Sequence, residues 1–526
     1  PNNTKPPNNT KPPNNTKPSN NTKPSNNTKP SNNSSESSDN SSESSDNSSE
    51  SSNNSSEPKQ PSTPAASNPP SSSPPPANEP KVTGVEQRLT GQFGNYFGVT
   101  QPPLITTIEE AQSSLRQIEQ VTGLKPALVY AFFQPQSSAS GQQNSDSSGQ
   151  TRNQKQMLWQ FNPYGLTSGL EQLLPQTENA QPTDQLELVV VTSSGTIVRR
   201  RVEGATRQRV LATAREFHST VTNSRNPRGY LTPAQQLYKW LIASIEPDLK
   251  AQQINNLSFI MDTGLRSLPI AALHDGKGFL VERYSVGLMP SLSLTDTSYV
   301  DVRELKVLAM GASEFTDLRS LPAVPVELSS IVGKLWQGKS FFNENFTWDN
   351  LKTARAKDNF GIIHLATHGE FLPGKAGNSY IQMWNSKLRL DQLKQLELGK
   401  NPRVELLVLS SCRTALGDEQ AELGFAGLAV LAGVKSAMGS LWYVSDEGTL
   451  GLMTTFYREL KQVPVKAEAL RQAQLAMLKG QVRLEGGKLL ADGSSIPLPP
   501  ELVQLGDKDL THPYYWSAFT MIGNPW

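Results

Sequence analysis

Apolar residues in the second half of the chain form short, nearly continuous runs that alternate with segments of helical periodicity. Such runs are typical of parallel strands that are covered on both faces. They predict strands at 306–310, 360–365, 404–409 and 434–441. Helical spacing of apolar residues predicts helices at 325–336, 421–431, 447–460 and 466–478. The alternation of strand and helix indicates an α/β fold with a mostly parallel sheet.

The first half of the globular part has a more mixed pattern. It predicts helices at 105–121, 205–221 and 233–249, strands at 127–133 and 257–261, and a hairpin at 186–202 that turns at Ser194 and Gly195. A stretch rich in Gln, Ser, Asn and Gly, residues 134–156, interrupts this pattern and is predicted to be a disordered surface insertion. We therefore expect an N-terminal half at 86–300 and a second half at 301–526.

Residues 1–85 are of a different kind. Five copies of a hexapeptide, Pro/Ser-Asn-Asn-Thr-Lys-Pro, fill residues 1–30, and Ser-rich near-repeats follow to about residue 57. Up to that point proline is the only apolar side chain, so the segment buries too little surface to offset the entropy of ordering its backbone. We predict a disordered, low-complexity tail.

Charge and composition exclude several classes of function. The formal net charge is +1 and no Lys/Arg cluster recurs, so no nucleic-acid partner is expected. No apolar run approaches the roughly 20 residues that span a bilayer, which predicts no membrane span and a soluble protein. The sequence does not identify the compartment, and a cytoplasmic location is slightly favoured. One cysteine in 526 residues excludes an intrachain disulfide framework and a cysteine-rich zinc site.

That single cysteine, Cys412, follows the apolar run 404–409, and His368 lies 44 positions before it, after the run 360–365. Because carboxyl ends of parallel strands meet at one edge of a sheet, two neighbouring strands would bring both residues together. The order His then Cys is that of caspase-like enzymes, whereas papain-like enzymes have the reverse order. Cys412 is therefore a candidate nucleophile and His368 a candidate base.

The chemistry of thiol attack explains why these residue types matter. A thiol attacks as thiolate, and an imidazole lowers the thiol pKa and later protonates the leaving amine. Gly369 has no Cβ, so its N–H and that of Cys412 would form an oxyanion hole. For an arbitrary Cys and His without further context, the more common case is a small buried cysteine at a strand end and a histidine in a turn.

Three segments supply that context, and they resemble the CHAT family of caspase-like cysteine peptidases related to separases. They are His-Leu-Ala-Thr-His-Gly-Glu-Phe at 364–371, Leu-Ser-Ser-Cys-Arg-Thr-Ala at 409–415 and Gly-Ser-Leu-Trp-Tyr-Val-Ser-Asp-Glu-Gly-Thr at 439–449, with weaker matches at 258–273 and 289–292. The resemblance implies a caspase-like α/β sandwich preceded by a degenerate caspase-like half. It maps His368 and Cys412 onto a catalytic dyad that cleaves a protein or peptide substrate without a cofactor.

The sequence also departs from true caspases. Around Cys412 the chain reads Ser-Ser-Cys-Arg-Thr where Gln-Ala-Cys-x-Gly would be expected, so aspartate specificity does not carry over. By the resemblance, Trp442, Asp446 and Glu447 would border the substrate pocket. Alternatively the two acids cap the helix that begins near Glu447. His364 lies inside its strand and is predicted to be a hydrogen-bonded core residue.

Two other functions stay open at this level. The caspase-like fold could serve as an adaptor or sensor module whose catalysis is silent or is switched on by an activating partner protein. Many members of the family carry an array of helical repeats that acts as a sensor. No tetratricopeptide-like period appears in 86–526, so an array of this kind would have to be supplied by another protein or chain segment. Nucleotide binding needs a Gly-rich loop after the first strand, and Met310-Gly311-Ala312-Ser313 is a poor one. The remaining histidines, His218, His274 and His512, have no metal-ligand spacing.

Overall fold

The computed structural model describes residues 79–99, 104–135, 180–414, 418–491 and 493–526. These residues all belong to one compact unit, Pro74–Trp526. Most of the predicted tail and nearly all of the predicted insertion lie outside the described residues. No helix among the described residues is both long enough and apolar enough to cross a membrane.

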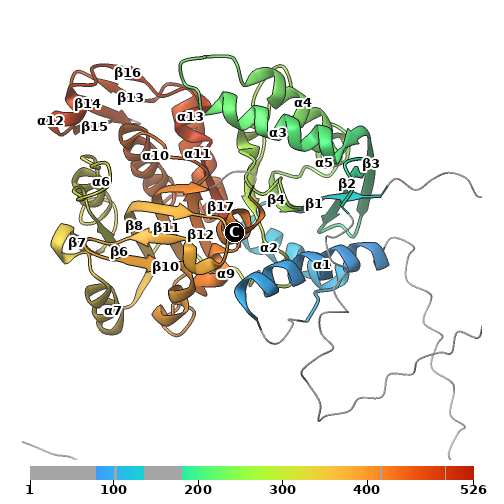
Figure 1. Ribbon diagram of the computed structural model, residues 1–526, viewed down its shortest axis with the longest axis horizontal. Helices are drawn as coiled ribbons and strands as arrows, with labels where there is room; N and C mark the ends of the chain where they lie inside the picture. The colour runs from blue at the N-terminus through green and yellow to red at the C-terminus, as the bar shows by residue number, and fades with distance from the viewer. Residues whose placement is uncertain (1–78, 100–103, 136–179, 415–417, 492) are drawn as a thin grey trace, which may run out of the picture. The chain divides into compact units, whose positions relative to one another are not determined.

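Thirteen of the described strands form one sheet that runs through both halves of the chain (Figure 1). Its neighbours, from one edge to the other, are β7 (Gly338–Phe342), β6 (Lys306–Gly311), β8 (Phe360–Phe371), β11 (Leu406–Thr414), β12 (Ser436–Ser440), β17 (Phe519–Gly523), β5 (Ser285–Leu288), β4 (Asn256–Met261), β1 (Pro126–Gln134), β2 (Gln185–Thr192) and β3 (Ile197–Thr206). Two short strands complete the sheet: β9 (Tyr380–Gln382) pairs antiparallel with the last residues of β8, and β10 (Lys387–Arg389) pairs with β9.

The sheet is mostly parallel, as the apolar runs predicted. β7, β6, β8, β11 and β12 are parallel neighbours, and so are β17, β5, β4 and β1. β17 runs antiparallel to β12 and thereby joins the two halves. Residues 360–369 of β8 are all buried, and each buried Leu, Ile or Val contributes about 1.5–3 kcal/mol. The α/β fold class is thus confirmed.

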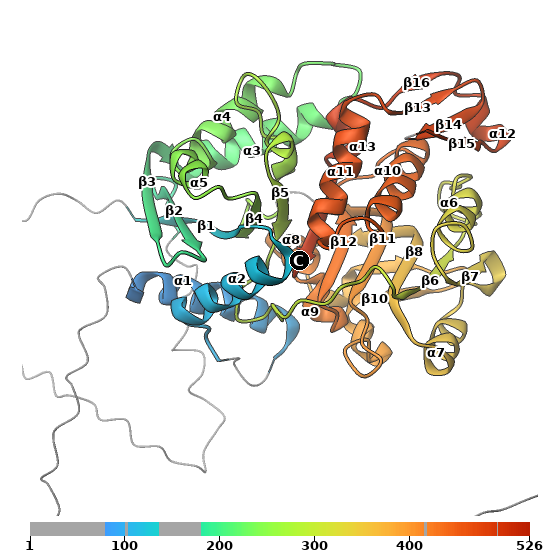
Figure 2. The same ribbon diagram turned by 180° about the vertical axis from the view of Figure 1, so that it is seen from behind.

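Helices lie on both faces of the sheet. In the N-terminal half α3 and α4 lie on one side of the strands and α1 and α2 on the other (Figure 1). In the second half α10 and α11 lie over β11 and β12, while α6 and α7 lie on opposite sides of β6 and β7 (Figure 2). The helices are α1 (Glu79–Phe97), α2 (Ile108–Thr122), α3 (Arg207–Val221), α4 (Leu231–Leu241), α5 (Glu246–Ala251), α6 (Val324–Ile331), α7 (Trp348–Lys357), α8 (Glu419–Ala426), α9 (Leu428–Ala432), α10 (Asp446–Glu459), α11 (Lys466–Leu478), α12 (Pro500–Val503) and α13 (Pro513–Trp516).

The start of the folded part differs from the prediction. The tail was predicted to extend to residue 85, but α1 begins at Glu79, so disorder is wrong for 79–85. The physical reason is a buried stripe at helical spacing. Val85, Leu89, Phe93 and Phe97 recur every four residues and are each at most 8% exposed, so the helix packs from its second turn onward.

Two predicted helices are each divided in the structure. The segment 233–249 contains α4 and α5, with a break around Ile242 and Ile245. The segment 421–431 contains α8 and α9, which meet at Gly427. A Cβ at Gly427 would collide with the ring of Phe97 in α1. Because α1 packs so closely against this junction, glycine is required there. No local sequence pattern indicates this contact.

Several short strands had no counterpart in the prediction. They include β5, β7, β9, β10 and β17, and a separate four-stranded sheet of β13 (Val482–Glu485), β14 (Lys488–Ala491), β15 (Ser494–Pro497) and β16 (Lys508–Asp509). Strands of two to five residues are too short for an alternating or continuous apolar pattern to stand out. Their existence depends on neighbours that are distant in sequence.

Candidate active site

β8 and β11 lie side by side in the middle of the second half and carry the predicted dyad. Their parallel register pairs Ser411 with His368 and Cys412 with Gly369. Both strands continue further than predicted, to Phe371 and Thr414, so the two residues lie within strand extensions rather than after the strands. A register shift between Leu409 and Ser411 marks where the extension begins. The backbone thus brings His368 and Cys412 onto adjacent positions of neighbouring strands.

The imidazole of His368 is held by a main-chain carbonyl. His368 is 7% exposed, and its Nε2 lies 2.6 Å from the carbonyl oxygen of Arg319. A carbonyl only accepts hydrogen bonds, so Nε2 donates and Nδ1 carries the lone pair in the neutral ring. Nδ1 is buried and has no hydrogen-bond partner among the described atoms. This nitrogen is therefore available to accept a proton.

Burial lowers the pKa of His368, and the Arg319 carbonyl and the negative charge of Glu370 oppose this shift. The imidazole is consequently neutral near pH 7, which is the form that acts as a base. Aromatic rings contribute to the burial: Phe315 lies 4.8 Å from the imidazole centroid to centroid, and Tyr443 meets it edge-on at 5.8 Å.

Glu370 follows the glycine of the His-Gly pair and is fixed by two tyrosines. Its carboxylate accepts hydrogen bonds from the hydroxyls of Tyr380 at 3.1 Å and Tyr443 at 3.2 Å. Sequence reasoning did not single out Glu370, Tyr443 or Phe315, although the first two lie inside the family-like segments. Arg319 had no signal at all, because its contribution is a carbonyl that every residue has.

For Cys412 the structure describes the backbone and not the side chain. Its neighbour Gly369 is buried and flanked on both sides, by Cys412 of β11 and by Ile381 of β9. An N–H that pairs within either ladder is not free to bind an oxyanion. The assignment of the Gly369 and Cys412 N–H groups to an oxyanion hole accordingly stays a prediction.

His364 has the structural role that its position predicted. It is fully buried, and its Nε2 lies 2.8 Å from Oε1 of Glu327, which is 1% exposed. Its Nδ1 lies 3.1 Å from the hydroxyl of Tyr457. The Tyr457 pKa is raised well above its usual value, mainly by burial. These groups tie α6 and α10 to β8 inside the core.

The three predicted pocket residues each have a partner within the fold. Trp442 is 5% exposed and donates its indole N–H to the carbonyl of Tyr514 at 3.1 Å. Glu447 is 3% exposed and pairs with Lys508 at 2.5 Å. Asp446 accepts a hydrogen bond through Oδ2 from the N–H of Ala323 at 2.5 Å.

The predicted alternative of a helix cap is partly realised. Ser445 is the N-cap of α10 and its hydroxyl accepts from the N–H of Gly448 at 3.4 Å, while Asp446 and Glu447 occupy the first turn. Burial raises the pKa of Asp446 to about 7, and the charges of Glu327 and Glu447 add to this shift. Asp446 therefore changes its charge in the neutral range.

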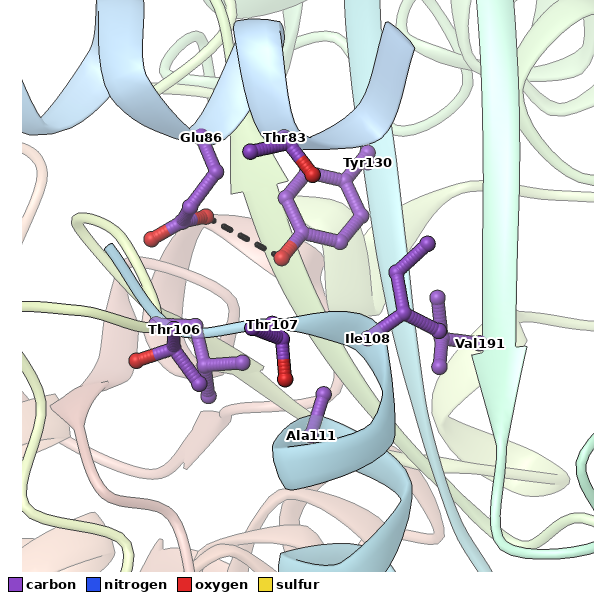
Figure 3. Close-up of a pocket in the computed structure, with 9 residues that line it drawn as sticks. Thr83, Glu86, Thr106, Thr107, Ile108, Ala111, Tyr130 and Val191 are labelled. Carbon is purple, nitrogen blue, oxygen red and sulfur yellow. Dashed lines mark hydrogen bonds between the residues drawn. The ribbon is translucent and has the colours of Figure 1, made fainter. Parts of the chain in front are cut away.

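Other parts of the described chain offer less for chemistry. A small hollow in the N-terminal half has Glu86 and Tyr130 on its wall, joined by a hydrogen bond of 3.0 Å (Figure 3). Glu86 also accepts from the N–H of Ser293 at 2.7 Å, and burial raises its pKa. This carboxyl anchors α1 to the sheet. No group of three or more His, Cys, Asp or Glu side chains within the described ranges is placed to bind a metal.

Comparisons with known proteins agree with the family-like segments. A model of the CHAT domain matches residues 231–524. Similar solved structures include two of the Saccharomyces cerevisiae separase–securin complex, both at 10% identity, with TM-scores of 0.33 and 0.40, covering 63% and 80% of this chain. This chain spans 21% and 31% of the matched separase chains.

A complex of Porphyromonas gingivalis RgpB pro- and mature domains is also similar, at 11% identity and a TM-score of 0.36. The match covers 56% of this chain and 69% of the matched chain of that complex. A comparison with curated proteins finds no match.

Proposed function

Because the chain belongs to the CHAT domain family of caspase-like peptidases, we propose that it is a cysteine endopeptidase that cleaves protein partners through Cys412 and His368. The observation that carries this proposal is the pairing of β8 with β11, which places His368 and Cys412 one register position apart near the carboxyl ends of neighbouring strands. The Nδ1 of His368, which is buried and has no hydrogen-bond partner among the described atoms, adds the acceptor that a thiol needs.

In the first step, His368 Nδ1 takes the thiol proton and the Cys412 sulfur attacks the scissile carbonyl carbon. The carbonyl electron pair moves onto oxygen, and the N–H groups of Gly369 and Cys412 would stabilise that oxyanion. The Arg319 carbonyl, which accepts a hydrogen bond from Nε2 at 2.6 Å, stabilises the imidazolium that forms.

In the second step, the oxyanion collapses and the peptide C–N bond breaks. His368 returns its proton to the leaving amine, which leaves a thioester on Cys412. Water, deprotonated by the same imidazole, then attacks the thioester and releases the acid product and free thiol. The cycle needs no metal or cofactor in this proposal.

The substrate pocket is the least constrained part of the proposal. Since Lys508 neutralises Glu447, Asp446 is the acid that would recognise a substrate side chain at the rim near Trp442. A carboxylate there favours a basic residue before the scissile bond, by about ten- to hundredfold through a charge-assisted hydrogen bond.

This preference is testable with a positional peptide library. We expect basic residues to be favoured by the parent enzyme and the preference to fall in Asp446→Asn, with Glu447→Gln as the matched control that retains it. Because the pKa of Asp446 is about 7, the preference should strengthen as the pH rises through 7. Cleavage after apolar residues, unchanged by Asp446→Asn, would restrict Asp446 to a role inside the fold.

A further inference from the structure

The segment between β6 and α6 is attached to the candidate active site at two points that lie four residues apart. At one point the carbonyl of Arg319 accepts from His368 Nε2 at 2.6 Å. At the other the N–H of Ala323 donates to Asp446 Oδ2 at 2.5 Å. The same short segment therefore contacts both the candidate base and the first turn of α10.

Main-chain hydrogen bonds keep this segment in one conformation. The N–H of Leu321 donates to the carbonyl of Ser313 at 2.8 Å, and the N–H of Val324 donates to the carbonyl of Leu321 at 3.1 Å. Ala323 is the N-cap of α6, and its carbonyl accepts from the N–H of Glu327 at 2.9 Å. A displacement of Ala323 would thus also displace the Arg319 carbonyl.

We propose that Asp446 is a positioning residue, which holds Ala323 and thereby fixes the Arg319 carbonyl that orients His368 toward Cys412. The proposal rests on the proposed Cys412–His368 dyad. It adds a role for Asp446 that does not depend on which substrate is bound. The Arg319 side chain is exposed, so its own packing does not fix the carbonyl, and the hydrogen bonds of the segment that follows it do.

The charge of Asp446 should control how firmly it holds Ala323. An ionised carboxylate accepts a hydrogen bond more strongly than a protonated one, so the anchor tightens as the pH rises through the Asp446 pKa of about 7. Charged groups of three neighbouring parts of the fold act on Asp446. They are Glu327 of α6, Arg319 of the loop and Glu447 of α10, which itself pairs with Lys508 of β16.

The test measures alkylation of Cys412 by iodoacetamide as a function of pH, without any substrate. Cys412 is the only cysteine, so the rate reports this thiol alone. We expect the parent to show an inflection near pH 7 and Asp446→Asn to lose it. Above pH 7 the variant should react about five-fold more slowly, which is the difference between a charge-assisted and a neutral hydrogen bond.

The direction of the change separates positioning from simple electrostatics. Removing a negative charge by itself favours the thiolate and would speed alkylation, whereas a lost anchor slows it. Asp446→Ala, which has no acceptor, should react more slowly than Asp446→Asn at every pH. Glu447→Gln should keep the inflection but move it to lower pH, because the Glu447 charge raises the pKa of Asp446.

Equal melting temperatures exclude unfolding, and if Asp446→Asn does not fold, the shift in Glu447→Gln decides the question. An inflection that survives in Asp446→Asn, or faster alkylation above pH 7, overturns the proposal. Peptide cleavage is assayed in the same preparations. If the alkylation profile changes as expected while no peptide is cleaved, the positioning role stands and the proposed peptidase function fails.

Discussion

Replacement of Cys412 by alanine is expected to reduce peptide cleavage by about 10⁴-fold or more, and His368→Ala should do the same. Groups that act as one unit in nucleophilic catalysis lose most of the rate when either is removed. The double variant should therefore be hardly slower than either single variant. Steady-state cleavage of a peptide pool, with the three variants at equal concentration, measures both effects.

The melting temperature of each variant provides the control for this experiment. His274→Ala is a matched substitution outside the site, since His274 Nδ1 accepts from the N–H of Gly276 at 2.9 Å and the ring packs edge-on against Phe279. It should retain parental turnover. Comparable turnover by Cys412→Ala and the parent, at equal melting temperature, would remove the peptidase proposal.

Substitution of His364 should instead destabilise the fold. His364→Ala leaves the carboxyl of Glu327 buried without its partner at 2.8 Å. Leaving a buried polar group without its partner costs about 1–3 kcal/mol. The free energy of unfolding, from urea denaturation followed by tryptophan fluorescence, should fall by that amount. The milder Glu327→Gln, which keeps a hydrogen-bonding group next to His364, should lose less.

Substitutions of the two histidines in β8 are thus expected to have opposite effects on stability and on cleavage. His364→Ala should lower the urea midpoint and spare the chemistry of the molecules that stay folded. His368→Ala should spare the midpoint and abolish cleavage. A His364→Ala protein with parental stability and no activity would contradict the structural role of His364 and draw it into the catalytic site.

Much of the framework of the candidate site could be predicted from local sequence. The apolar runs at 360–365 and 404–409 are long and continuous, so they identified β8 and β11, and parallel strands bring their ends together. The family-like segments then singled out His368 and Cys412 among residue types that are usually structural. These inferences depended on a few neighbouring residues and needed no knowledge of distant contacts.

Contacts between segments that are distant in the chain could not be predicted from the sequence. The carbonyl that holds His368 belongs to Arg319, and a main-chain group has no residue signature. Lys508 lies 61 residues after its partner Glu447, so nothing local showed that this acid was already paired. Nor did any pattern place β17 between β12 and β5, where a strand of five residues joins the two halves of the sheet.

The most direct measurement of the central claim is covalent labelling by a panel of peptidyl chloromethyl and acyloxymethyl ketones. These electrophiles require a thiolate that is aligned as in catalysis. We predict one adduct per chain, mapped by mass spectrometry to the tryptic peptide 404–413 at Cys412, and much slower labelling of His368→Ala. Cleavage of peptides by a protein whose Cys412 stays unlabelled, or an adduct at another residue, would contradict the account.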